Sequence, residues 1–169
     1  MRNFLVLLLL CFSANLCLGQ KDITVIYNHD YSVTINGISI DKSTTYQEMV
    51  ELLGEPEVYK EYRTGKTNYH YKELGLVIHT VDGKLLTLAF NFNWDGDKNF
   101  PNSTFIGGLT IGDKEIDKNT TADIVDELKS LGIECYIPRM CMNNPKTVKN
   151  PIILGFKDDL ITQVSIEFH

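Results

Sequence analysis

The chain has 169 residues, with 16 basic and 22 acidic side chains and a formal net charge of −6. This acidic balance disfavours nucleic acid or an anionic membrane surface as the partner, because both reward clusters of basic residues. The length suits one domain with a sizeable core, or two small units that share one.

Residues 1–19 predict a secretory signal peptide. Arg2 supplies the positive start, residues 4–12 form a short apolar run, and Cys17-Leu18-Gly19 offers a small residue at the cleavage point before Gln20. The run is shorter than the roughly 20 residues that a spanning helix needs, and no second run is long enough. We therefore expect an exported protein, periplasmic or extracellular. Without the signal, 15 basic and 22 acidic residues remain, a net charge of −7 that would suit a basic protein partner.

An internal repeat organises the remaining sequence. Val33–Leu52 and Leu109–Leu128 align at an offset of 76, with nine of 20 pairs identical. A repeat of this length predicts two copies of one structural unit. We assign them to residues 20–92 and 105–169, joined by a polar linker at residues 93–104.

The first copy predicts a strand over Ile23–Tyr27, then a hairpin over Val33–Ile40. Asn36-Gly37 suits a two-residue turn, which places Val33 opposite Ile40 and Ile35 opposite Ile38 on one face.

A helix is expected next, capped by Thr44 with Gln47 three residues on, and ended by Gly54. Its apolar stripe comprises Tyr46, Met49, Val50 and Leu53. Four strands follow, over residues 58–62, 69–71, 76–80 and 85–92. The last alternates apolar and polar residues, which predicts a half-buried strand.

The second copy predicts the same elements in weaker form. Its hairpin turns at Gly112-Asp113, and its helix begins near Thr120 with Asp123 three residues on. Residues 136–150 diverge from the first copy, whereas Gln163–Phe168 alternates like its closing strand. The predicted fold class is α+β: two tandem repeats, each a β-hairpin, one helix and an antiparallel sheet.

Motifs in the first copy carry a family resemblance. They are the helix ending in Gly54-Glu55-Pro56, then Tyr69-His70-Tyr71, Gly75-Leu76-Val77-Ile78 and Asp82-Gly83-Lys84-Leu85. This pattern resembles the family of beta-lactamase inhibitor protein and the small outer-membrane lipoproteins of barrel assembly. It also resembles a domain of unassigned function common in secreted proteins of Bacteroidota. The second copy lacks the Gly-x-Pro and Tyr-x-Tyr signals. The resemblance implies a protein-binding fold and lends no catalytic residues.

Cys135 and Cys141 remain after removal of the signal, an even pair in an exported chain. They are disulfide candidates, with two reduced thiols as the alternative.

Other motifs give little support to metal or catalytic chemistry. Asn93, Asp95, Asp97 and Asn99 place oxygen side chains at alternate positions, as weak calcium candidates, but Lys98 and Thr104 stand where an EF-hand loop needs Gly and Glu. The histidines lack metal-ligand spacing, and no nucleophile elbow or phosphate loop occurs. We expect no cofactor and no enzyme activity.

Aromatic residues are the main binding candidates, because tyrosine and tryptophan are enriched at binding hot spots. The candidates are Tyr59, Tyr62, Tyr69, Trp94 and Phe100. Trp94 and Phe100 lie in the polar linker, which favours their exposure. The sequence thus favours a secreted or periplasmic, non-enzymatic protein-binding module: an inhibitor, an immunity-type factor or an envelope assembly accessory. The alternatives are an envelope enzyme with an unrecognised active site and a calcium-stabilised structural module.

Overall fold

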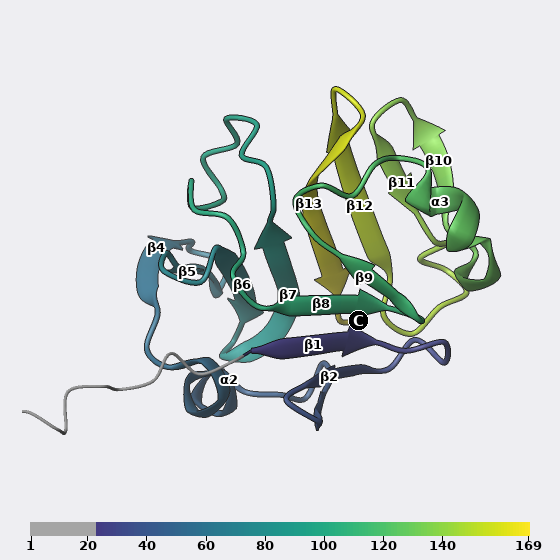
Figure 1. The fold of residues 1–169 in the computed structure, drawn as a ribbon. Helices are drawn as coiled ribbons and strands as arrows, with labels where there is room; N and C mark the ends of the chain where they lie inside the picture. Colours follow the sequence, from purple (N-terminus) through teal and green to yellow (C-terminus); the bar gives the residue numbers. More distant parts are fainter. Residues whose placement is uncertain (1–22) are drawn as a thin grey trace, which may run out of the picture.

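The computed structural model describes residues 23–169, which form two β-sheets packed on each other (Figure 1). The five-stranded sheet has the order β3-β2-β1-β8-β9, and the eight-stranded sheet has the order β10-β11-β12-β13-β7-β6-β5-β4. In Figure 1, β1 and β8 run across the direction of β7, β12 and β13. The predicted signal peptide, residues 1–19, lies outside the described residues.

The smaller sheet joins the hairpins of the two copies. Its strands are β1 (Thr24–Tyr27), β2 (Val33–Ile35), β3 (Ile38–Ile40), β8 (Gly108–Ile111) and β9 (Lys114–Ile116). Strand β1 pairs antiparallel with β2 and parallel with β8, so it bridges the two hairpins.

The predicted hairpin registers are confirmed: Val33 lies opposite Ile40, and Ile35 lies opposite Ile38. Asn36 and Gly37 adopt positive φ angles of 51° and 79°, as a two-residue turn requires. Ile38 is nevertheless 55% exposed, whereas Ile40 on the same edge strand is buried.

The larger sheet takes four consecutive strands from each copy. These are β4 (Glu57–Glu61), β5 (Lys66–Tyr71), β6 (Leu76–Val81) and β7 (Lys84–Asn91), then β10 (Glu134–Ile137), β11 (Met140–Met142), β12 (Ile152–Lys157) and β13 (Leu160–Glu167). The closing strands β7 and β13 pair antiparallel at the centre, with Ala89 opposite Ser165. The expectation that β7 is half buried is wrong. Thr87, Ala89 and Asn91 are also buried, and the Asn91 side chain bonds to the linker that follows this strand.

The helix of the first copy, α2, spans Tyr46–Leu53. Its N-cap is Thr45 and not the predicted Thr44. The Thr45 hydroxyl accepts from the Glu48 amide, and the Glu48 carboxylate accepts from the Thr45 amide, which completes a capping box. Met49 and Leu52 are its buried residues, so the predicted apolar stripe is only partly correct.

The helix of the second copy is much shorter than predicted. Helix α3 covers only Ile124–Glu127, and a 3₁₀ turn, η1 (Lys129–Leu131), follows it. At the repeat offset of 76, Ile124 stands where the first copy has Glu48. The second copy therefore cannot form the capping box, and its N-cap residue Asp123 makes no side-chain cap bond.

These elements overturn the predicted α+β class. Strands account for 44% of the structure and helices for 10%, and α2 is the one helix of seven or more residues in the part of the chain described. The fold is therefore β-rich, without one helix for each repeat.

A single hydrophobic cluster takes buried residues from both copies, including Ile35, Ile78, Leu109 and Val164. At its border, the hydroxyl of buried Tyr27 donates to the Asn150 carbonyl oxygen at 2.8 Å. Such a bond satisfies a polar group that burial would otherwise penalise.

Candidate functional site

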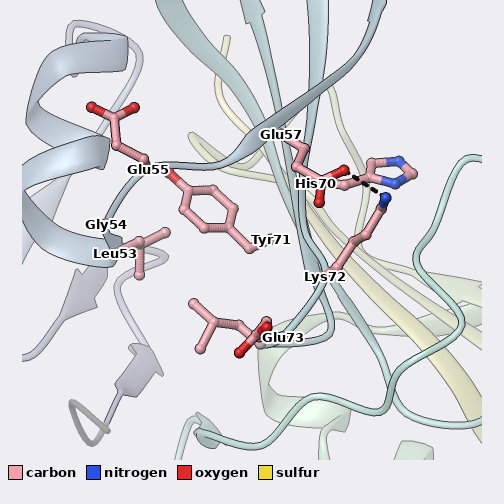
Figure 2. Close-up of a pocket in the computed structure, with 9 residues that line it drawn as sticks. Leu53, Gly54, Glu55, Glu57, His70, Tyr71, Lys72 and Glu73 are labelled. Carbon is pink, nitrogen blue, oxygen red and sulfur yellow. Dashed lines mark ion pairs between the residues drawn. The ribbon is translucent and has the colours of Figure 1, made fainter. Parts of the chain in front are cut away.

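The linker, residues 93–104, covers one side of the larger sheet, which we call the linker face. Strand alternation places His70 of β5, opposite Val77 of β6, on this side. The His70 Nε2 atom lies 2.9 Å from the Asn99 carbonyl oxygen. Figure 2 shows His70 and Lys72 on one side of β5 and Tyr71 on the other, toward α2. The linker is thus held against strands of the first copy.

An aromatic hollow of about 380 Å³ lies on this face, between β4 and the linker. It is lined by Tyr59, His70, Lys72, Trp94, Lys98, Phe100, Pro101 and Asn102. Tyr59 is 44% exposed and Trp94 is 49% exposed, which is high for large aromatic side chains.

Short-range contacts fix the aromatic hollow. The Tyr59 ring stacks on the His70 ring, with centroids 4.1 Å apart and planes 13° apart. The Trp94 indole nitrogen donates to the Asp97 carbonyl oxygen at 3.1 Å. Lys72 pairs with Glu57 at 2.5 Å (Figure 2), so the basic rim of the hollow is partly neutralised.

The structure therefore brings together three of the five aromatic candidates: Tyr59, Trp94 and Phe100. Tyr62 lies in a neighbouring groove that shares Phe100. Tyr69 does not join them. Its ring stacks on Tyr46 of α2, with centroids 4.6 Å apart, on the other side of β5.

The neighbouring polar groove has a volume of about 560 Å³ and was not found by sequence reasoning. Its walls include Lys66, Asn68, His79, Phe100, Ser165 and Glu167. Asn68 is only 2% exposed. Among residues 23–169, no hydrogen-bond partner is present for its Oδ1 atom or for His79 Nε2. The only sequence signal was the series of polar residues Lys66, Asn68 and His70 at alternate positions of β5, beside a single histidine, His79, on the apolar strand β6.

The electrostatics of the two histidines follow from burial. Burial lowers the pKa of His79 to about 4, and the nearby Lys66 charge adds to this effect. Burial also lowers the pKa of His70, against the opposing effect of its bond to the Asn99 backbone. His79 is therefore neutral near pH 7, with one nitrogen that donates and one that accepts.

The weak calcium candidates are engaged in bonds within and around the linker. Asn93 donates to the carbonyl oxygens of Lys118 and Ile161, both at 2.7 Å. Asp95 Oδ1 accepts from the Asp97 amide, and Asp97 Oδ1 accepts from the Asn99 amide. Over the described part of the chain, no group of three His, Cys, Asp or Glu side chains is placed to hold a metal ion.

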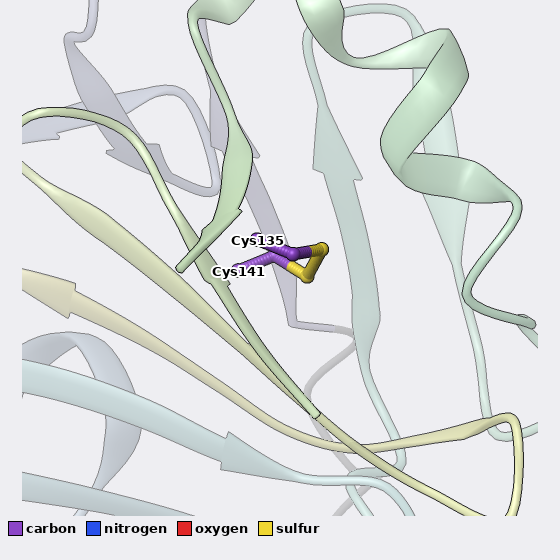
Figure 3. Close-up of a disulfide and its surroundings, with 2 residues drawn as sticks. All are labelled: Cys135 and Cys141. Carbon is purple, nitrogen blue, oxygen red and sulfur yellow. A yellow bond between two sulfur atoms is a disulfide. The ribbon is translucent and has the colours of Figure 1, made fainter. Parts of the chain in front are cut away.

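The titratable groups of the polar groove do not form a nucleophile–base pair. The one ion pair among them in residues 23–169 joins His169 Nε2 to Glu167 at 3.2 Å. Cys135 and Cys141 are joined in a disulfide across the hairpin of β10 and β11 (Figure 3). Neither sulfur is then a free thiol for a cysteine–histidine pair.

Within residues 23–169, no helix is both long and apolar enough to cross a membrane. No curated protein and no solved structure matched the chain. Residues 13–126 match a family described as a domain of unknown function, DUF7738. This match takes in the first copy, the linker, the second hairpin and most of α3, and it ends before β10. Because it covers more than half of the sequence, the chain belongs to the DUF7738 family.

Proposed function

We propose that this chain is an exported, non-enzymatic module that binds another protein through the aromatic hollow. The convergence of Tyr59, Trp94 and Phe100 carries the proposal. These residues come from β4 and from the linker, yet they line one depression. Tyr59 and Trp94 are exposed and Phe100 is half-buried. Aromatic side chains of this kind bury much apolar area on binding, and tyrosine and tryptophan retain polar groups for orientation.

The rigidity of the hollow supports the same proposal. Stacking on His70 holds Tyr59, and a backbone hydrogen bond holds the Trp94 ring. Side chains that are fixed before association lose less conformational freedom when they bind, so more of the contact energy appears as affinity.

The charges around the hollow define the partner surface. The chain as a whole is acidic, and its net charge favours a basic partner. The hollow itself has Lys72 and Lys98 in its walls, and Lys98 has no ion pair among the described residues. We therefore expect the docking segment to be apolar, with an acidic residue facing Lys98, on a protein that is basic overall.

Site-specific photo-crosslinking in envelope extracts would test this function. A photoreactive phenylalanine analogue at Trp94 should capture a defined protein, while the same group at Ile38, which is 55% exposed on the smaller sheet, should not. With the captured protein purified, Trp94→Ala and Tyr59→Ala should each weaken binding by about tenfold or more. The Ile38→Ala control should bind like the wild type. Equal capture at both positions, or unchanged affinity of the aromatic variants, would refute the proposal.

A further inference from the structure

The polar groove contains two buried polar atoms without partners, side by side. Asn68 on β5 lies opposite His79 on β6, and both side chains line the groove. Four buried side-chain atoms in residues 23–169 lack a partner, and two of them are Asn68 Oδ1 and His79 Nε2. A buried polar group without a hydrogen bond destabilises the folded protein. Two such groups in one cavity therefore point to an occupant that satisfies them.

The charge of the groove limits the class of occupant. Its walls hold one lysine, Lys66, against the carboxylates of Asp97 and Glu167, with His169 beside Glu167. Phosphate and other strongly anionic groups are bound where cations are in excess, which is not the case here. The volume of about 560 Å³ lies within the usual range for small-ligand sites. This composition disfavours an anion, and because Lys66 and the His169–Glu167 contact offset much of the negative charge, the groove suits a small, uncharged and polar ligand better than a cation.

The hydrogen-bonding chemistry narrows the class further. An asparagine amide and a neutral imidazole each donate and accept, and a hydroxyl group does both as well. Ser165 adds a third side chain of this kind, and Phe100 gives an apolar wall for a ring of C–H groups. We propose that the polar groove binds a neutral saccharide, with its hydroxyl groups bonded to Asn68 and His79. This site is adjacent to the aromatic hollow and does not depend on the protein-binding function.

The stability of the free protein tests the first half of this proposal. If Asn68 serves a ligand and not the fold, Asn68→Leu removes an unsatisfied group while it keeps the number and branching of the side-chain heavy atoms. The melting temperature of the free protein should then rise by about 2–4 °C. Asn91→Leu is the matched control on the same sheet. Its Oδ1 atom also lacks a partner among the described residues, but the Asn91 amide nitrogen donates to the carbonyl oxygens of Pro101 at 3.1 Å and Ser103 at 2.7 Å, so loss of these two bonds should lower the melting temperature. A lower melting temperature for Asn68→Leu, or failure of this variant to fold, would show that Asn68 is structural and would overturn the proposal.

Titration of the wild-type protein tests the ligand class directly. Glucose, galactose and N-acetylglucosamine would be added separately while the Asn68 amide and His79 ring signals are followed by NMR. At least one sugar should shift both signals in a saturable way, and Asn68→Leu should weaken that binding by about tenfold or more. Glucose 6-phosphate should bind more weakly than glucose. The proposal is wrong if no sugar shifts these signals or if the phosphorylated sugar binds more tightly. It is also wrong if only a Gly-Asn-Gly peptide with blocked termini binds, because the groove would then recognise amide groups and not sugar hydroxyl groups.

Discussion

The stability of this protein should fall as the pH is lowered from about 6.5 to about 4, and His79 should be a major cause. The ordinary histidine pKa of 6.5 applies to the unfolded chain, whereas burial lowers the pKa of folded His79 to about 4. Between these values the unfolded state binds a proton that the folded state rejects, so acid favours unfolding. The contribution of neutral His79 to the stability is fully present above pH 6.5 and is lost progressively as the pH falls toward 4.

The size of this effect follows from the difference between the two pKa values. At about 1.4 kcal/mol per pH unit, the interval from 6.5 to about 4 corresponds to at most about 3–4 kcal/mol. His70 should add a smaller contribution of the same sign, since burial lowers its pKa as well.

Urea unfolding followed by circular dichroism at a series of pH values would measure the effect. His79→Gln replaces the titrating ring by a neutral amide, so it should remove most of the slope above about pH 4. Ser165→Ala alters the same groove without removing a titrating group, and it should keep the wild-type slope. The reasoning would be refuted if His79→Gln showed the same pH dependence as the wild type.

Three further predictions concern the framework of the site. Gly75 has a φ of +70°, and a Cβ atom at this position would overlap the linker backbone. Gly75→Ala should therefore lower the free energy of unfolding by about 3–5 kcal/mol. Gly83→Ala, at a φ of +74° in open space, should cost only about 1–2 kcal/mol, and equal losses would contradict the close approach at Gly75. Replacing Cys135 and Cys141 by serine should lower the unfolding free energy by about 2–3 kcal/mol in urea, and an unchanged midpoint would rule out a stabilising role. Thr45→Ala removes the capping box and should lower the free energy of unfolding by about 1 kcal/mol in thermal melting. An unchanged melting temperature would argue against a stabilising capping box.

Local patterns predicted the elements whose geometry depends on neighbouring residues. Asn36-Gly37 fixed the hairpin register because few dipeptides tolerate two positive φ angles in succession. The same approach overestimated the second helix. The apolar spacing at Ile124 and Leu128 is helical, but the substitution at the position of Glu48 removes the bonds that start such a helix.

The candidate site was only partly predictable, because it depends on the path of the linker. Tyr59 and Trp94 are 35 residues apart, and they meet because the linker folds over the sheet. Tyr69 resembled Tyr59 as a candidate, but strand alternation places it against Tyr46. Asn68 gave no warning of its importance, since a polar residue in a strand is usually on a solvated face.

The position of β13 has a consequence for the order in which the protein folds. It neighbours β7 at the centre of the larger sheet, although it is the last strand in the described chain. Until residues 160–167 leave the ribosome, β7 presents an open edge that can pair with other chains. Closing the sheet links strands about 75 residues apart, which makes this step slow relative to local hairpin formation. A chain that is still being synthesised would thus keep this edge open until its last strand emerges, and a chaperone that covers β7 in that interval would protect it from aggregation.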